Sequence, residues 1–115
     1  MNLPLQGLLG GQLNKMLAGH MENWQKALQE LQAMRVTASS GGGVVEATAS
    51  GVGELLDVVI DPELVESGDV EMVQDLVVSA VREVLAKANE TYRERLKASF
   101  GNLGNLVDNY MPGLF

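Results

Sequence analysis

Three short strand-like runs between two long helical patterns constrain the fold of this 115-residue chain more than any other feature. The runs cover residues 35–39, 44–50 and 55–60, and glycine-rich stretches at 39–43 and 51–53 separate them. Glycine supplies the positive φ angles that hairpin turns need, so this order predicts a three-stranded antiparallel meander between two helices. Such a sheet has two faces, and one chain of this length has few ways to cover both without a partner copy. We therefore expect an α+β protomer of order α-β-β-β-α that forms a small oligomeric binding module.

The helical pattern before the strands runs from Leu13 to Met34. Its apolar seam steps by four and three through Leu13, Leu17, His20, Trp24, Ala27, Leu31 and Met34. A period of about 3.5 residues predicts a long helix that lies against another helix or a sheet. The pattern leaves two interpretations open, a helix packed on its own sheet and an arm that pairs with a second copy.

The chain after the strands predicts a short helix and then a long one. Asp61 and Pro62 are typical of an N-cap and a first turn, which gives a short helix through Val65. A second start follows at residues 67–69, and apolar residues recur at helical spacing from Met72 onward. This apolar face is broad and needs more cover than one three-stranded sheet offers.

The domain organisation follows from these patterns. Residues 13–100 form the predicted folded domain. Residues 1–12, with Pro4 and three glycines, and the Gly- and Asn-rich residues 101–115 are expected to be flexible segments. The chain has no cysteine and only 4% aromatic residues, so the core must be aliphatic and free of disulfides.

The net charge of −7 is unevenly distributed. Residues 36–66 hold six acids and no base, whereas residues 1–35 and 85–115 each carry a net charge of +1. Binding to phosphates uses clustered Lys and Arg, so a polyanion would have to approach the first helix and the far end of the second. The acidic strands would repel a polyanion, so they are not expected to bind it.

No residue set in the sequence assembles a catalytic, cofactor or metal site. His20 is the one histidine and lies on the apolar seam, and no pattern supplies it with a nucleophile or an orienting partner. The run from Ser39 to Gly43 leads into a strand rather than a Gly-Lys-Ser/Thr helix start, which excludes a Walker loop. We expect no enzyme activity, no cofactor and no bound metal. No apolar stretch approaches the roughly 20 residues that cross a bilayer, so we expect a cytoplasmic protein with no membrane partner.

Two features permit both a purely structural and a functional interpretation. Trp24 lies at a heptad position and either packs there or offers a stacking platform for a base. The bases near the end of the second helix, interleaved with Glu90 and Glu94, form either a solvated face with ion pairs or a DNA-binding patch that a dimer would double. These bases are Lys87, Arg93, Arg95 and Lys97.

The order and spacing of several short motifs resemble those of the YbaB/EbfC family of small bacterial nucleoid-associated proteins. The similarity runs from about Met16 to Phe100 and continues in the tail. The motifs are Gln25-Lys26-Ala27-Leu28-Gln29-Glu30, Val36-Thr37, Ser40-Gly41-Gly42-Gly43, Gly51, Ile60-Asp61-Pro62, Asp75-Leu76-Val77 and the ending Met111-Pro112-Gly113-Leu114-Phe115.

The resemblance implies a tweezer-shaped homodimer with projecting first helices that binds double-stranded DNA in the nucleoid without catalysis. It casts Lys15 and Lys26 as phosphate contacts on the arms and places Arg35 at the base of the arm. Charge alone adds Arg93, Arg95 and Lys97 to the predicted DNA-binding set.

The chain departs from the family pattern in its strands. Where relatives commonly carry a basic residue, this chain has Glu46 and, near the corresponding stretch of the third strand, Leu56 and Asp57. The leading hypothesis is therefore a homodimeric, largely sequence-nonspecific DNA-binding protein that uses its helical arms. The alternative is a protein-interaction module on the same dimer scaffold, with weak or lost DNA binding, that holds a protein partner through its acidic sheet or apolar tail.

Overall fold

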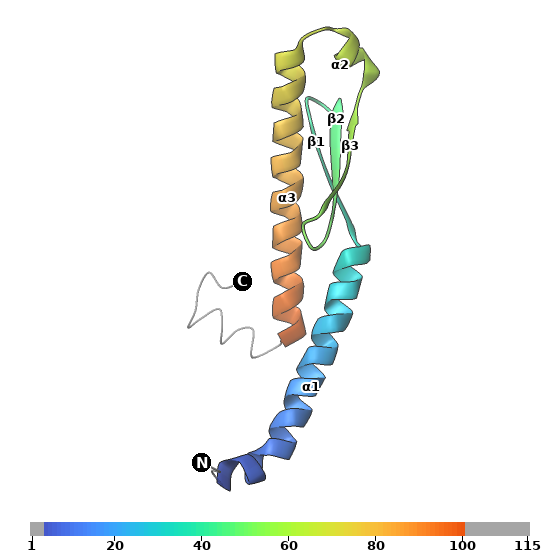
Figure 1. The fold of residues 1–115 in the computed structure, drawn as a ribbon. Helices are drawn as coiled ribbons and strands as arrows, with labels where there is room; N and C mark the ends of the chain where they lie inside the picture. Colours follow the sequence, from blue (N-terminus) through green and yellow to red (C-terminus); the bar gives the residue numbers. More distant parts are fainter. Residues whose placement is uncertain (1–3, 101–115) are drawn as a thin grey trace.

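The chain folds into a long helix, a three-stranded sheet, a short helix and a second long helix (Figure 1). The computed structural model describes the backbone of residues 4–100 and the side chains of Lys15 and of residues 18–99. The elements are α1 (Pro4–Ala33), β1 (Arg35–Ser40), β2 (Val45–Ser50), β3 (Leu55–Ile60), α2 (Pro62–Glu66) and α3 (Val70–Phe100). This confirms the predicted α-β-β-β-α order and the three-stranded antiparallel sheet.

The strand boundaries agree with the sequence prediction to within one residue, but α1 begins earlier than expected. We predicted a flexible segment over residues 1–12 and a helix from Leu13, whereas α1 begins at Pro4. Proline is tolerated in a first helical turn because its missing N–H would have no partner there. The helix start was thus predicted too late, and the flexibility of this segment stays a prediction. The predicted tail at 101–115 lies outside the described residues.

The sheet has the order β1-β2-β3, and α3 covers one of its faces. The buried side of β2 consists of Val45, Ala47 and Ala49, all fully buried, which confirms the predicted alternation. Opposite them lie Ala80, Val84 and Ala88 of α3, which are fully buried too. Small alanine side chains on both surfaces let the helix approach the sheet closely, and this packing forms the core.

Polar contacts fix α3 over the β1 side of the sheet. The Ser40 hydroxyl donates to the Leu76 carbonyl oxygen at 2.6 Å, and Lys87 Nζ donates to the Thr37 carbonyl oxygen at 3.3 Å. Few contacts join α3 to β3. Leu55 and Leu56 of β3 are exposed in the single chain, as is Val59, which lies on the face of the sheet away from α3.

An aspartate caps the start of each helix that follows the sheet, and the sequence predicted the first of these caps, Asp61. The Asp61 side chain accepts a hydrogen bond from the backbone N–H of Glu63 at 2.9 Å, with Pro62 in the first turn of α2. Asp69 caps α3 in the same way and accepts from the N–H of Met72 at 3.0 Å.

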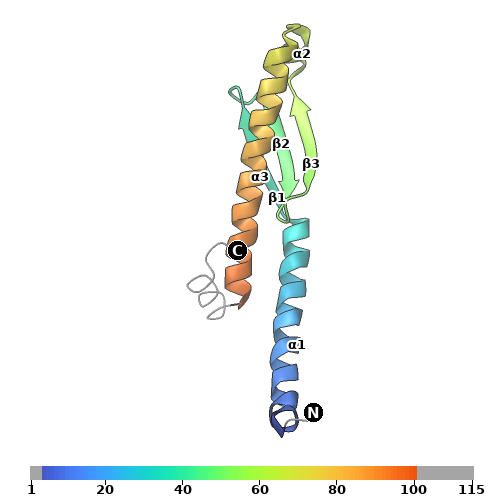
Figure 2. The ribbon, with the colours of Figure 1, turned by 60° about the vertical axis from the view of Figure 1, so that its left-hand side comes forward.

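The N-terminal part of α1 projects beyond the end of α3, which makes the molecule long and narrow (Figure 2). Its principal extents are 73 × 26 × 25 Å. Only the C-terminal part of α1 lies beside α3, so α1 forms an arm whose N-terminal part leads away from the sheet.

Candidate nucleic-acid interface

The two ends of the molecule differ in charge. The stretch from residue 54 to residue 75 covers β3, α2 and the first turns of α3, and it holds eight acids and no base. The opposite end carries Lys15 and Lys26 on α1 together with Arg93, Arg95 and Lys97 on the last turns of α3. A polyanion is repelled from the acidic end, so the arm end is the one suited to phosphates.

The structure brings two of the predicted cations, Lys26 and Arg95, to one groove between α1 and α3. The groove has a volume of about 230 Å³ and is lined by Asn23, Lys26, Glu30, Arg95, Ala98 and Ser99. Lys15 lies farther along the arm, and Arg35 lies at the start of β1. The six predicted residues therefore spread over α1, the start of β1 and the last turns of α3 rather than forming one compact patch.

Some of these cations form ion pairs with nearby acids, and others do not. Arg95 pairs with Glu30 across the two helices, and Lys26 Nζ lies 3.9 Å from Glu22 Oε1 one turn away on α1. Lys15 and Arg93 are exposed and form no salt bridge with any other residue that the structure describes. Both partners of the Lys26–Glu22 pair are about 70% exposed, and such pairs contribute little, so Lys26 is readily available to a phosphate.

Arg35 has a local structural contact that its sequence position did not reveal. Its Nη1 donates to the carbonyl oxygens of Gln32 and Met34, each at 3.1 Å. The last carbonyls of a helix lack intrahelical partners and carry partial negative charge, so a cation there stabilises the helix end. Arg35 thus caps the C-terminus of α1.

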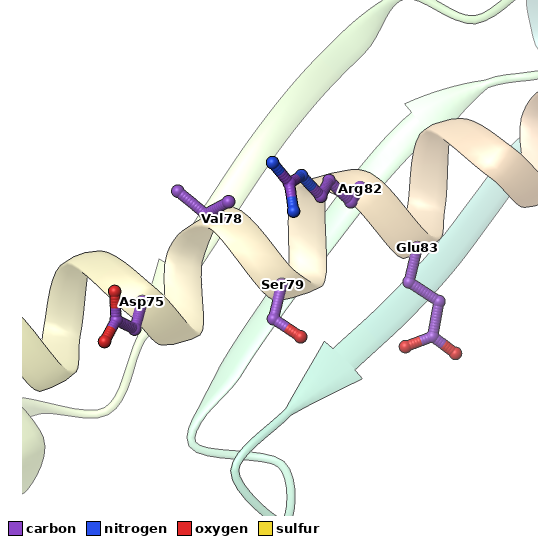
Figure 3. Close-up of a pocket in the computed structure, with 5 residues that line it drawn as sticks. All are labelled: Asp75, Val78, Ser79, Arg82 and Glu83. Carbon is purple, nitrogen blue, oxygen red and sulfur yellow. The ribbon is translucent and has the colours of Figure 1, made fainter.

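The remaining bases of the sheet end are surrounded by acids. Figure 3 shows a hollow on the outer face of α3, of about 500 Å³, lined by Asp75, Val78, Ser79, Arg82 and Glu83. All five residues come from one helix, so the hollow offers Arg82 among carboxylates rather than a basic cleft. Lys87 is held by Thr37 and lies 3.9 Å from Glu83.

Trp24 packs between the helices, which supports a packing role for this residue rather than stacking on a base. Its ring meets that of Tyr92 edge to face, with the centroids 6.4 Å apart and the planes at 80°. His20, one turn earlier on α1, is half-buried.

The open face of the sheet, on the side away from α3, is acidic. Antiparallel pairing places Thr48 opposite Asp57 and Glu46 opposite Val59 on this face, and all but the half-buried Thr48 are exposed. Glu46 and Asp57, two of the residues at which the chain departs from the family pattern, thus lie on the open face, where they would repel a phosphate backbone.

Over the described part of the chain, no three His, Cys or carboxylate side chains come together as metal ligands. Within the same residues no helix is both long and apolar enough for a bilayer.

Comparisons with known proteins agree with this geometry. A sequence profile described as the YbaB/EbfC DNA-binding family matches residues 9–103. A nucleoid-associated protein of Ruminiclostridium cellulolyticum is 38% identical over 112 residues, which cover 95% of this chain and 93% of the relative. One from Chlorobium phaeobacteroides is 47% identical over 96 residues, with coverages of 81% and 82%.

The fold itself resembles a solved structure. The crystal structure of an uncharacterized protein from Helicobacter pylori superimposes with a TM-score of 0.59 at 29% identity and covers 76% of this chain and 98% of that one.

Proposed function

The chain belongs to the YbaB/EbfC DNA-binding family, and from this premise we propose that it is a homodimeric nucleoid-associated protein that binds double-stranded DNA. Binding is largely sequence-nonspecific, involves no catalysis and uses backbone phosphates. The observation that supports this proposal most directly is the separation of charge, with exposed cations along the arm and acids at the opposite end.

Three of the six predicted residues, Lys15, Lys26 and Arg93, are the proposed phosphate contacts, and they lie on α1 or beside it on α3. Arg35 and Arg95 serve internal contacts with carbonyl oxygens and with Glu30. Lys97, half-buried on the last turn of α3, stays a prediction. Six contacts in a dimer predict a loss of affinity of roughly 10³-fold between 50 and 200 mM salt.

The proposed dimer rests on apolar surface that the single chain leaves open. Val70, Val78 and Leu85 are exposed along one side of α3, where their spacing follows the helical repeat. Leu55 and Leu56 are exposed on the neighbouring β3. A second copy that covers this surface would bury it and set two arms in one molecule.

A mobility shift on duplex DNA, measured from 50 to 200 mM salt, tests the binding proposal. We expect a complex at 50 mM that weakens steeply as salt rises. Absence of any shift at 50 mM would overturn it. Sedimentation at micromolar concentration tests the dimer separately, since a folded single subunit would contradict it.

The alternative function is a protein-interaction module. The acidic end supports it, because Val65 and Met72 are exposed among carboxylates there and would suit a basic, partly apolar protein surface. Wild-type protein that fails to shift DNA at low salt but stays dimeric would favour this function over DNA binding.

A further inference from the structure

The arm is held at two places. The first lies at the turn between β2 and β3. The backbone N–H of Gly51 donates to the Leu31 carbonyl oxygen at 2.8 Å. A Cβ on Gly51 would lie 2.8 Å from that same oxygen, so only glycine fits this approach. Leu31 itself is fully buried. This contact acts as the pivot of α1.

The second place is a set of contacts between α1 and the last turns of α3, which we call the interhelix strap. It consists of Trp24 packed on Tyr92, Glu30 paired with Arg95, and the Ser99 hydroxyl donating to the Asn23 carbonyl oxygen at 3.4 Å. Ala27 of α1 and Leu96 of α3 are buried there.

The arm amplifies any change at the strap. Sixteen residues separate Leu31 from Lys15, which is about 24 Å along a helix. A tilt of about 10° at the pivot would move Lys15 by about 4 Å, comparable to the 3.4 Å rise per nucleotide of one DNA strand. The direction of α1 therefore decides which phosphates its lysines reach.

We propose that Arg95 is a positioning residue for DNA binding rather than a phosphate contact, and that its pair with Glu30 sets the direction of the arm. Arg95 and Glu30 are far apart in sequence and lie on the two helices that the strap joins, so their attraction resists separation of α1 from α3. The pair is partly exposed and therefore sensitive to salt. Its effect on DNA affinity rests on the proposed function, whereas its effect on the arm does not.

Distance measurement within one chain tests the geometric part. The sequence has no cysteine, so Gly19→Cys on α1 and Asn89→Cys on α3 can carry two spin labels. Both positions are exposed, and nothing lies within 4 Å of where a Cβ on Gly19 would be. Dilution with unlabelled protein restricts the signal to one protomer, so dimerisation and DNA do not enter.

Four proteins are compared in this measurement: the labelled chain, Glu30→Arg, Arg95→Glu and the charge-swapped double variant. We expect each single variant to shift or broaden the distance distribution and the double variant to restore it. A distribution that is the same in all four, or one that the swap fails to restore, would overturn the proposal. Circular dichroism verifies that each variant keeps its helix content.

DNA affinity of Glu30→Gln separates positioning from direct contact. If Arg95 bound phosphate, removing the acid beside it would tighten binding. Positioning instead predicts weaker binding, by about threefold, as expected for losing an exposed ion pair. Tighter binding would refute the positioning role of Arg95, and loss of that gain in Glu30→Gln with Arg95→Gln would assign Arg95 to the DNA contacts. Failure of wild type to bind DNA, with the distance result intact, would count against the proposed function alone.

Discussion

The sheet end and the arm end of this protein are built on different principles. The sheet end buries small aliphatic residues, Ala47 and Ala80 among them, between α3 and β2, and turns a strongly acidic surface outward. The arm end has little core beyond the strap and carries exposed cations. Most of the core thus lies at one end and the proposed DNA contacts at the other, and most substitutions should affect stability and DNA binding separately.

Charge reversal on the arm should have the largest effect on binding. We expect Lys15→Glu with Lys26→Glu to weaken DNA binding by at least about 10²-fold at 100 mM salt, because four phosphate contacts per dimer become repulsive. The slope of log affinity against log salt should fall by about 4. Fluorescence anisotropy with labelled duplex measures both quantities.

The matched control carries the same charge change at the sheet end, on α3. Arg82→Glu with Lys87→Glu should change affinity by less than about threefold, since these residues lie away from the arm. Equal losses in both double variants would show that net charge, rather than the arm, governs binding.

Gly51→Ala should break the junction between the two ends. The added Cβ meets the Leu31 backbone, and overpacking of this kind costs about 2–3 kcal/mol of unfolding free energy. Urea denaturation measures the loss. Gly19→Ala is the control, because its Cβ meets nothing and it should stabilise α1 by up to about 1 kcal/mol. A neutral Gly51→Ala would contradict the tight pivot.

Trp24→Ala tests whether the arm contributes to stability at all. We expect a loss of about 1–2 kcal/mol from the missing ring pair and the half-buried surface. Met21→Ala, on an exposed part of the same helix, should cost less than about 0.5 kcal/mol. Equal costs would mean that the ring contact does not hold the arm. Thermal unfolding distinguishes the two variants.

Asp61→Ala gives the smallest effect and belongs to the sheet end alone. Loss of the cap on α2 should cost about 1 kcal/mol, with DNA affinity unchanged. Glu66→Ala removes an equal charge at the exposed end of α2 and should be close to neutral in stability. If the cap variant altered DNA binding as well, the two ends would not be independent.

The comparison also explains where sequence reasoning succeeded. Strand alternation at Val45, Ala47 and Ala49, the turn glycines at 41–43 and the cap at Asp61 could be predicted because each depends on neighbours within a few residues. The family resemblance rested on the order of such local signals.

The sequence by itself determined the order of elements, the buried face of the sheet and the acidic character of one end, since periodicity and composition carry that information. Tertiary structure alone decided that Arg95 meets Glu30, that Arg35 turns back onto the end of α1 and that Gly51 must admit the Leu31 carbonyl. Glu30 and Arg95 are 65 residues apart, and no local pattern encodes such a meeting. Packing of α1 against α3 brings them together, and the same packing directs the cations of the arm.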